Sequence, residues 1–318
     1  IHCYASAPKK IEPRDFDANQ CDFLLKEIDE AGVLEVCFTG GEPFFSRQTL
    51  PLSYKLAEKG FKLAYITNAS LLDENKISQL KEISPSFVRV SFHSYQEEKF
   101  NHITGTTNYE KVLNNVLNLK EKEIIPAISC TLFRGLNDSY EDIKGFMQFF
   151  KERGFQMSDI TFDEFVPDGC GKDLGFYRVN ELQAIEKISR ASKEIFSYDI
   201  PKGDKPPLKD SYCGIGLSSL CIKSTGDVTL CPVLSEPVLG NIFEEGLNKI
   251  WDNKDNFKYF RNKEYVRDTE CIECESLESC LGGCKAKAQT FYGTMNAPDP
   301  WMCAHLKNES PSKIPNSK

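Results

Sequence analysis

Residues 271–284 read CIECESLESCLGGC, a run that places four cysteines in fourteen residues with the spacing C-x2-C-x5-C-x3-C. The chain has 318 residues and 13 cysteines, and eight of these lie between Cys213 and Cys303. A chain this long builds an ordinary hydrophobic core, and its first residues show no apolar signal segment, so a disulfide framework is not expected. Clustered thiols in a reducing compartment usually bind metal, which predicts a cytoplasmic protein with a metal centre.

The identity of the metal has two readings at this point. A structural zinc site also uses C-x2-C pairs of cysteines. Two four-iron clusters would need about eight thiolate ligands, which matches the cysteines between Cys213 and Cys303. The spacing within residues 271–284 alone leaves zinc and iron–sulfur open.

Residues 15–200 alternate between strand-like and helix-like segments. Short β-branched or aromatic runs such as EVCFTG, KLAYITN and SFVRVSFH are separated by amphipathic stretches at residues 17–32, 108–122 and 139–154. Asp17 and Asn108 stand at positions typical of helix caps. Repeated strand and helix predict a parallel sheet, either in a βα barrel or in a doubly wound sheet.

The character of the sequence changes after residue 200. Residues 201–212 are rich in Pro and Lys and are interpreted as a linker, and residues 220–231 are predicted to form a hairpin that turns at 225–227. Residues 247–262 are predicted as one helix. The polar tail from residue 306 is predicted to be disordered.

The segment TGGEPFF, residues 39–45, directly follows a predicted strand. Ligands of parallel βα folds bind at the C-terminal ends of strands, where two glycines allow close backbone approach and Glu42 can pair with an ammonium group. A plain tight turn would explain this segment alone. The other strand ends are polar too, which predicts one shared site lined by Thr67, Asn68, Ser91, His93, Arg134 and Glu164.

These features together resemble the radical S-adenosylmethionine enzymes that carry a C-terminal SPASM domain. In that family a C-x3-C-x2-C loop binds a four-iron cluster; Cys3 followed by Tyr4 matches its last cysteine, and the two earlier ones would lie before Ile1. TGGEP matches the methionine-binding loop. The spacing C-x12-G-x4-C followed by C-x2-C-x5-C-x3-C and a final C matches the SPASM pattern at Cys213, Cys231, Cys271, Cys274, Cys280, Cys284 and Cys303.

The resemblance implies an α/β fold, a partial (β/α)6 TIM-like barrel followed by a small cysteine-rich SPASM domain with a β-hairpin. The barrel would occupy residues 1–200 and lack its N-terminal end. A linker at 201–212 would join it to a SPASM domain at 213–305, and a tail would follow at 306–318.

The resemblance also implies the cofactors, namely S-adenosylmethionine, one [4Fe–4S] cluster of the radical SAM type and two auxiliary [4Fe–4S] clusters. Cys3 would ligate the first cluster. Gly40, Gly41 and Glu42 would hold the methionine ammonium group, with Asn68 and Ser91 as further contacts. His93 is more typical of a structural residue at a strand end.

Family precedent divides the auxiliary ligands between an outer set and an inner set. The outer set would be Cys271, Cys274, Cys280 and Cys303, and the inner set Cys213, Cys231 and Cys284. Cys221 either completes the inner set or fills space in the hairpin, which would leave one iron open. The remaining cysteines are interpreted as small core residues (Cys21, Cys37 and Cys130) or as a residue that could face the site (Cys170).

Several reactions fit this plan. SPASM enzymes commonly modify peptides, so a maturase of a ribosomally made peptide or protein is expected, with reduced ferredoxin or flavodoxin as electron donor. Enzymes of alternative haem synthesis share the same domain plan. An anaerobic sulfatase maturase typically has an Asp after the Cys of the G-x4-C element, where this chain has Pro232.

Charge and hydropathy exclude other classes of partner. The net charge of -8 argues against broad electrostatic binding to nucleic acid or anionic membranes, and no apolar run is long enough to predict a transmembrane helix. One non-enzyme alternative remains, because only one of the three radical-cluster cysteines is present. In that alternative the chain is an iron–sulfur electron-transfer fragment.

Overall fold

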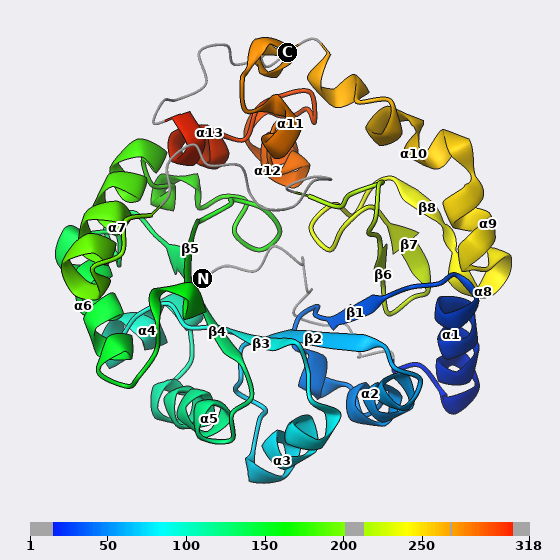
Figure 1. Cartoon of the computed structure of the whole chain (residues 1–318), viewed down its shortest axis with the longest axis horizontal. Helices are drawn as coiled ribbons and strands as arrows, with labels where there is room; N and C mark the ends of the chain where they lie inside the picture. The colour runs from blue at the N-terminus through cyan, green and yellow to red at the C-terminus, as the bar shows by residue number, and fades with distance from the viewer. Residues whose placement is uncertain (1–14, 201–212, 268, 308–318) are drawn as a thin grey trace.

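A parallel sheet occupies the lower half of the computed structural model, which describes residues 15–200, 213–267 and 269–307 (Figure 1). Five strands follow one another in the order β1-β2-β3-β4-β5, and each neighbouring pair is parallel. Spatial order equal to chain order is the arrangement of a βα barrel, whereas a doubly wound sheet reverses direction part-way. The predicted partial barrel is therefore confirmed, with strands β1 (Glu35–Phe38), β2 (Lys62–Thr67), β3 (Phe87–Ser91), β4 (Pro126–Leu132) and β5 (Ile160–Glu164).

Helices cover the outer face of this sheet because alternate strand residues point toward them. In β4, Ile128, Cys130 and Leu132 are buried on that face, while the residues between them are half-buried. Phe92, which follows β3, packs against Phe146 and Phe150, which lie on one covering helix. The helices of the barrel are α1 (Ala18–Glu30), α2 (Thr49–Glu58), α3 (Glu74–Ile83), α4 (Glu97–Thr104), α5 (Tyr109–Glu121), α6 (Tyr140–Lys151) and α7 (Glu181–Phe196).

The predicted helix starts differ in how they are capped. The side chain of Asp17 accepts from the backbone N–H of Gln20 at 2.8 Å, and Gln20 bonds back to the Asp17 N–H, so α1 opens on a full capping box. Asn108 stands at the start of α5 as predicted, but its side chain makes no cap hydrogen bond. Helix α5 depends instead on its buried face, which includes Val112 and Val116.

The cysteine-rich part begins with the predicted hairpin. β6 (Cys221–Ile222) pairs antiparallel with β7 (Asp227–Thr229), and β8 (Val238–Asn241) adds a third strand. The chain turns at residues 223–226, slightly before the predicted position. Short helices follow: α8 (Ile242–Glu245), α9 (Leu247–Asp252), α10 (Lys254–Arg261), α11 (Leu277–Cys280), α12 (Lys285–Tyr292) and α13 (Pro300–Lys307).

The single helix predicted for residues 247–262 is wrong. The chain forms α9 and α10, with Asn253 in an extended conformation between them. The Asn253 side chain accepts from the backbone N–H of Asp255 at 3.1 Å, so it starts a new helix instead of continuing the old one. An Asn between two amphipathic stretches is therefore a helix boundary here.

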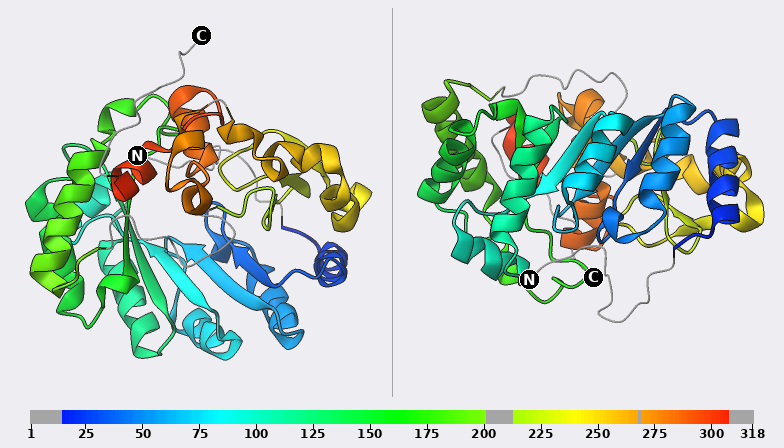
Figure 2. Two further views of the ribbon diagram at one scale, coloured as in Figure 1. Left: turned by 45° about the horizontal axis from the view of Figure 1, so that its top comes forward. Right: turned by 90° about the horizontal axis from the view of Figure 1, so that it is seen from below.

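Two ends of the cysteine-rich part close onto the barrel. Figures 1 and 2 show a ring, in which α8 and α9 meet α1 on one side and α13 meets α7 on the other. The main hydrophobic core crosses this boundary, because Ile242, Leu247 and Trp301 belong to the same cluster as the barrel residues. The Glu27 carboxylate of α1 accepts from the backbone N–H of Leu247 at 2.7 Å, which fixes the first turn of α9 to the barrel.

The three cysteines predicted to be small core residues differ in their burial. Cys21 and Cys130 are buried as predicted, whereas Cys37 is exposed. The interpretation of Cys37 as a core residue is wrong because its side chain lies on the strand face opposite the half-buried Val36 and Phe38.

The predicted linker at 201–212 and the tail after residue 307 lie outside the described residues. No helix of the described part is long and apolar enough to cross a membrane.

Substituting Glu27 by Ala is expected to loosen the contact between the two parts. The Leu247 N–H loses a charged acceptor, which lowers the free energy of unfolding by about 1.5–3 kcal/mol. Urea unfolding measured without oxygen tests this. The control is Glu30→Ala on the same helix, where a surface pair with Lys26 at 3.6 Å contributes little. Equal destabilisation by both substitutions would contradict this role of Glu27.

Candidate cofactor and cluster sites

The loop after β1 is tied to the end of β2 by one carboxylate. Glu42 accepts hydrogen bonds from the hydroxyl of Thr67 at 2.7 Å and from the backbone N–H of Asn68 at 2.8 Å. It also accepts from the backbone N–H of Phe44 at 3.2 Å, at the start of the short 3-10 helix η1 (Pro43–Phe45). Glu42 thereby holds two neighbouring strand ends together.

Glu42 keeps room for one more donor. A carboxylate offers about four acceptor positions, of which three are used here. Burial raises the pKa of Glu42, and the hydrogen bonds from Thr67, Asn68 and Phe44 oppose that rise. An ammonium group at the remaining position would stabilise the ionised form further, so this residue fits the methionine end of S-adenosylmethionine.

The two glycines leave an open face beside this carboxylate. Gly40 has a φ of 121°, which side chains rarely adopt. A Cβ placed on Gly40 or Gly41 would meet no atom within 4 Å. The backbone of this loop is therefore accessible to a ligand, which fits the assignment of Gly40, Gly41 and Glu42 as cofactor contacts.

The other predicted contacts lie farther along the same rim. The Asn68 side chain accepts from the backbone N–H of Ser70 at 2.8 Å, which leaves its amide N–H groups for a ligand. Ser91 ends β3 and is in register with Ser129. His93 is buried, and its Nδ1 accepts from the backbone N–H of Thr131 at 3.2 Å, which favours the structural interpretation. Cys3 lies outside the described residues.

The structure brings the outer thiols together around one narrow cleft. Its walls include the four predicted outer ligands Cys271, Cys274, Cys280 and Cys303. Burial, followed by the charges of Cys271 and Cys280, raises the pKa of Cys303 to about 12. These thiols are therefore close enough to interact, and binding a metal cluster would have to displace their protons.

The inner thiols interact in the same way. Burial is the main cause that raises the pKa of Cys213, and Cys231 adds to it. Burial also raises the pKa of Cys284 to about 12, with Asp299 and Cys213 as smaller contributions. Burial is the main cause that raises the pKa of Cys221; Lys223 and the Thr229 hydroxyl oppose the rise, and the nearby Cys231 thiol adds to it. The place of Cys221 beside the inner set keeps its ligation a prediction.

The described residues do not form a binding site for a single metal ion. No group of three or more His, Cys, Asp or Glu side chains there converges tightly enough to hold one metal ion. The outer thiols line the walls of a cleft instead. An iron–sulfur cluster requires thiolate ligands that surround a group of several iron atoms, and not thiolates that converge on a single ion.

Sequence reasoning missed a buried carboxylate between the two sets. Asp299 is 1% exposed and accepts from the backbone N–H groups of Cys284 at 2.9 Å and Trp301 at 3.0 Å. It thereby connects the loop that carries Cys284 to α13, which carries Cys303. An Asp preceding a helix is a cap signal in the sequence, but its second partner is fifteen residues away and is set by the tertiary fold.

Two lysines after Cys284 were also missed. Lys285 and Lys287 are both buried in α12. Lys287 Nζ lies 2.6 Å from Asp163 Oδ1 and 3.4 Å from Glu164 Oε1 at the end of β5. Burial opposes its charge, but the carboxylates of Asp163, Asp299 and Glu164 raise the pKa of Lys287 overall.

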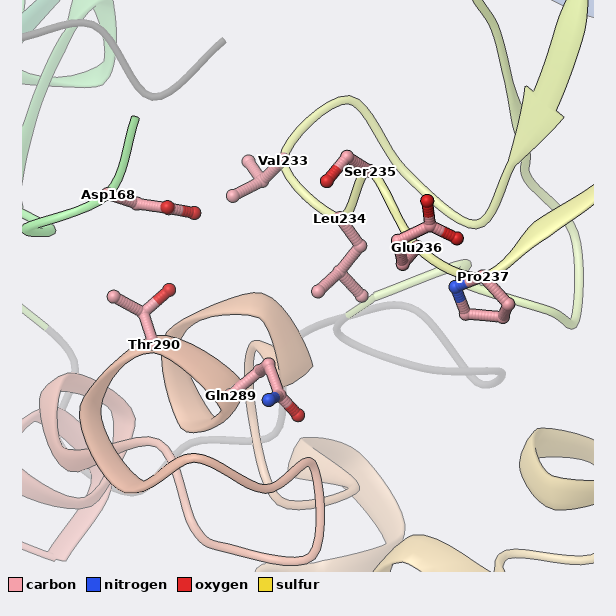
Figure 3. A pocket seen from close by; sticks show the side chains of 8 residues that line it. All are labelled: Asp168, Val233, Leu234, Ser235, Glu236, Pro237, Gln289 and Thr290. Carbon is pink, nitrogen blue, oxygen red and sulfur yellow. The ribbon is translucent and has the colours of Figure 1, made fainter. Parts of the chain in front are cut away.

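A cavity of about 390 Å³ opens where the barrel meets the cysteine-rich part. Figure 3 shows Asp168, from the segment after β5, facing Val233 and Leu234 across the cavity, with Thr290 of α12 beside it. The cavity is lined by Asp168, Val233, Leu234, Ser235, Glu236, Pro237, Gln289 and Thr290. The walls from the cysteine-rich part lie in the segments that follow Cys231 and Cys284. Cys170 is exposed in the segment after β5, near Asp168.

Family models match both parts of the chain. Residues 1–150 match the radical SAM superfamily, and residues 213–275 match SPASM, an iron–sulfur cluster-binding domain. The chain is a radical SAM enzyme with a SPASM domain. A [4Fe–4S] cluster and S-adenosylmethionine are therefore its cofactors, and the SPASM part binds iron–sulfur. The alternative of a non-catalytic electron-transfer fragment is not supported.

Curated relatives of this radical SAM/SPASM enzyme differ in the activities for which they are named. It is 24% identical to the Fe-coproporphyrin III synthase of Methanosarcina barkeri, over 97% of this chain and 85% of the relative. It is 21% identical to the mycofactocin maturase MftC of Mycolicibacterium smegmatis, over 97% and 81%. It is 23% identical to the PqqA peptide cyclase of Bradyrhizobium diazoefficiens, over 95% and 82%.

Solved structures share the fold of the radical SAM/SPASM enzyme. SuiB of Streptococcus suis bound to its precursor peptide SuiA has a TM-score of 0.70 at 16% identity, over 95% of this chain and 72% of SuiB. Native anSMEcpe with bound AdoMet has a TM-score of 0.67 at 16% identity, over 92% of this chain and 85% of that chain. At this identity, the likeness concerns the fold alone.

Glu42→Gln is expected to weaken binding of S-adenosylmethionine roughly 10–100-fold, because one charge-assisted hydrogen bond is worth about 1.5–3 kcal/mol. Anaerobic calorimetry with the cluster-loaded enzyme measures this. Thr67→Val removes a donor to Glu42 and an acceptor for the backbone N–H of Ala69 but keeps the carboxylate charge, so it is expected to have the smaller effect on this binding. An unchanged dissociation constant for Glu42→Gln would contradict the contact.

Replacing one outer thiol, Cys274→Ser, is expected to lower the iron content by roughly four atoms per chain, because a four-iron cluster loses a ligand. Iron and acid-labile sulfide are measured after anaerobic purification. Cys37→Ser, an exposed thiol outside both sets, serves as the matched control and should retain all iron. Equal loss in both variants would refute the assignment of Cys274.

Proposed function

We propose that this radical SAM enzyme modifies a peptide or protein substrate, as a maturase of a ribosomally made peptide does. When bound, the reduced cluster and S-adenosylmethionine supply a 5′-deoxyadenosyl radical that removes a hydrogen atom from an unactivated carbon. The residues of this chain bind the cofactor, place the substrate and exclude water.

The observation that carries this proposal is the lining of the cavity at the junction of the two parts. It combines two carboxylates, Asp168 and Glu236, with apolar Val233, Leu234 and Pro237, and with the neutral polar side chains of Ser235, Gln289 and Thr290. Apolar walls with a few polar groups suit an amino-acid side chain and its backbone amides. Similarity to a mycofactocin maturase and to a PqqA peptide cyclase supports the same class.

The haem-synthesis alternative meets an electrostatic obstacle at this cavity. A porphyrin that carries propionate groups is an anion, and among the described residues that line the cavity there is neither Lys nor Arg. Asp168 and Glu236 would repel carboxylates, since like charges in a partly desolvated site are unfavourable. A peptide with neutral or basic side chains avoids this cost.

Different groups of residues have different roles in the proposed reaction. Gly40, Gly41 and Glu42 would hold the methionine ammonium group, with Asn68 and Ser91 along the same rim. The cluster of the radical SAM type would depend on Cys3. The outer auxiliary cluster would be held by Cys271, Cys274, Cys280 and Cys303, and the inner one by Cys213, Cys231 and Cys284, with Cys221 as the fourth candidate. Reduced ferredoxin or flavodoxin is the expected electron donor.

The test compares two substrate classes with one enzyme preparation. The cluster-loaded enzyme is incubated without oxygen with S-adenosylmethionine, a reductant, and either short peptides encoded beside its gene or coproporphyrin. Formation of 5′-deoxyadenosine together with a mass change in a peptide is the expected result. A change in coproporphyrin and in none of the peptides would overturn the proposal.

Charge-neutral variants of the cavity sharpen this test. Asp168→Asn and Glu236→Gln keep acceptors for the backbone N–H groups of Gly169 and Val238, which these side chains now bind at 2.7 and 3.2 Å. For a basic peptide, KM is expected to rise roughly tenfold per lost charge pair, about 1.4 kcal/mol, while formation of 5′-deoxyadenosine without peptide stays unchanged. An unchanged KM in both variants would place the substrate elsewhere.

A further inference from the structure

Lys285 is a buried cation in the cysteine-rich part. Its side chain is 2% exposed, and Nζ donates to the backbone carbonyls of Gly282 at 3.2 Å and Ala297 at 3.3 Å. The ammonium also lies 4.8 Å from the ring centroid of Tyr265. These contacts solvate the group in part, but each involves a neutral partner.

No carboxylate of the described residues lies within ion-pair distance (4.0 Å) of Lys285 Nζ, in contrast to Lys287 in the same helix. Asp299 is near enough to raise the pKa of Lys285, but its oxygens are engaged by backbone N–H groups of Cys284, Trp301 and Met302. Burial nevertheless lowers the pKa of Lys285 below its usual value, against the opposing charges of Cys271, Cys280, Asp299 and Cys284. Because buried charges are normally paired or placed beside metal sites, this ammonium lacks its main counter-charge.

The nearest candidates for that counter-charge are the thiols. A Cβ built on Gly282 would lie 2.5 Å from Lys285 Nζ, and Gly282 lines the cleft of the outer thiols. The ammonium therefore lies directly behind the wall of this cleft. Its charge interacts with Cys271 and Cys280 of the outer set and with Cys284 of the inner set.

We propose that Lys285 is a positioning residue whose charge raises the reduction potentials of the auxiliary clusters, above all the cluster held by Cys271, Cys274, Cys280 and Cys303. The proposal rests on the ligand assignment made under the proposed function. Cluster potentials depend on net charge, burial and hydrogen bonds around the sulfurs. Reduction adds an electron, and a buried cation nearby stabilises the added charge.

The competing interpretation is purely structural. The bonds to the carbonyls of Gly282 and Ala297 connect the Cys280–Cys284 loop to the segment before α13. Under that interpretation Lys285 matters for loading of the clusters but not for their potentials. The two interpretations predict different results for neutral variants that still bind iron.

The experiment is a potentiometric titration followed by electron paramagnetic resonance on anaerobically loaded enzyme. The background carries Cys3→Ala, which removes the signal of the radical SAM cluster. Lys285→Met removes the charge and the donors, whereas Lys285→Gln removes the charge and keeps donors. Both are expected to keep iron and sulfide. One auxiliary reduction potential is expected to fall by about 59 mV, which corresponds to a tenfold change in the equilibrium constant for one-electron reduction.

Two companion variants fix the sign and the specificity. Asp299→Asn removes a negative charge between the same thiols and is expected to shift the potential upward. Lys258→Met removes an exposed lysine of α10, whose side chain is 60% exposed and pairs with Asp255 at 3.2 Å, and is expected to leave both potentials unchanged.

Each outcome decides the proposal. Iron-loaded Lys285→Met and Lys285→Gln with parental potentials would overturn it and leave the structural interpretation. If neither neutral variant loads iron, Lys285 is required for loading, as the structural interpretation holds, and the proposal is overturned. Absence of iron and sulfide in the parent would refute the ligand assignment instead.

Discussion

The carboxylate of Asp299 is the interaction on which the arrangement of the thiols depends. It accepts from the Cys284 N–H at 2.9 Å and caps the helix that carries Cys303, while its own N–H bonds the Gly282 carbonyl at 3.0 Å. The turn before Cys284 must be glycine here, because a Cβ on Gly283, at φ 71°, would lie 2.3 Å from the Asp299 Cβ. One buried acid thus holds segments of both ligand sets in a fixed relation.

Closure of the ring places this assembly against the barrel. The last strand of the described barrel, β5, ends at Asp163 and Glu164, and Lys287 reaches both from the helix that begins after Cys284. Glu164 is 2% exposed, and burial raises its pKa well above the usual range, so its main favourable partner is this lysine. The rim at which polar strand ends gather is therefore continuous with the cluster-binding part, because charged groups from both parts are paired there.

The sequence allowed prediction of whatever depends on spacing and periodicity. Cysteine spacing indicated the cysteine-rich SPASM part, and the alternation of strand and helix indicated the barrel with the Glu42 loop at its rim. Features set by tertiary contacts were not predictable in this way. The partners of Asp299 and Lys285 come from distant segments, and Asn253 breaks a continuous amphipathic pattern by a local side-chain bond. Cys37 looked like a core residue because its strand reads as apolar, yet only one face of β1 is covered.

The segments that carry the predicted inner thiols also line the cavity proposed to bind substrate, which couples the two places physically. The backbone N–H of Leu234 donates to the Cys231 sulfur at 3.3 Å, and Leu234 lines the cavity. Gln289 and Thr290 line the opposite wall, in the helix that begins after Cys284. A sulfur that carries negative charge is a better hydrogen-bond acceptor than a neutral thiol, so the proposed ligation at Cys231 would strengthen the bond that positions Leu234. Loading of the proposed inner site would therefore order the wall of the cavity, and an enzyme without that cluster would have a less ordered cavity as well as a missing redox centre.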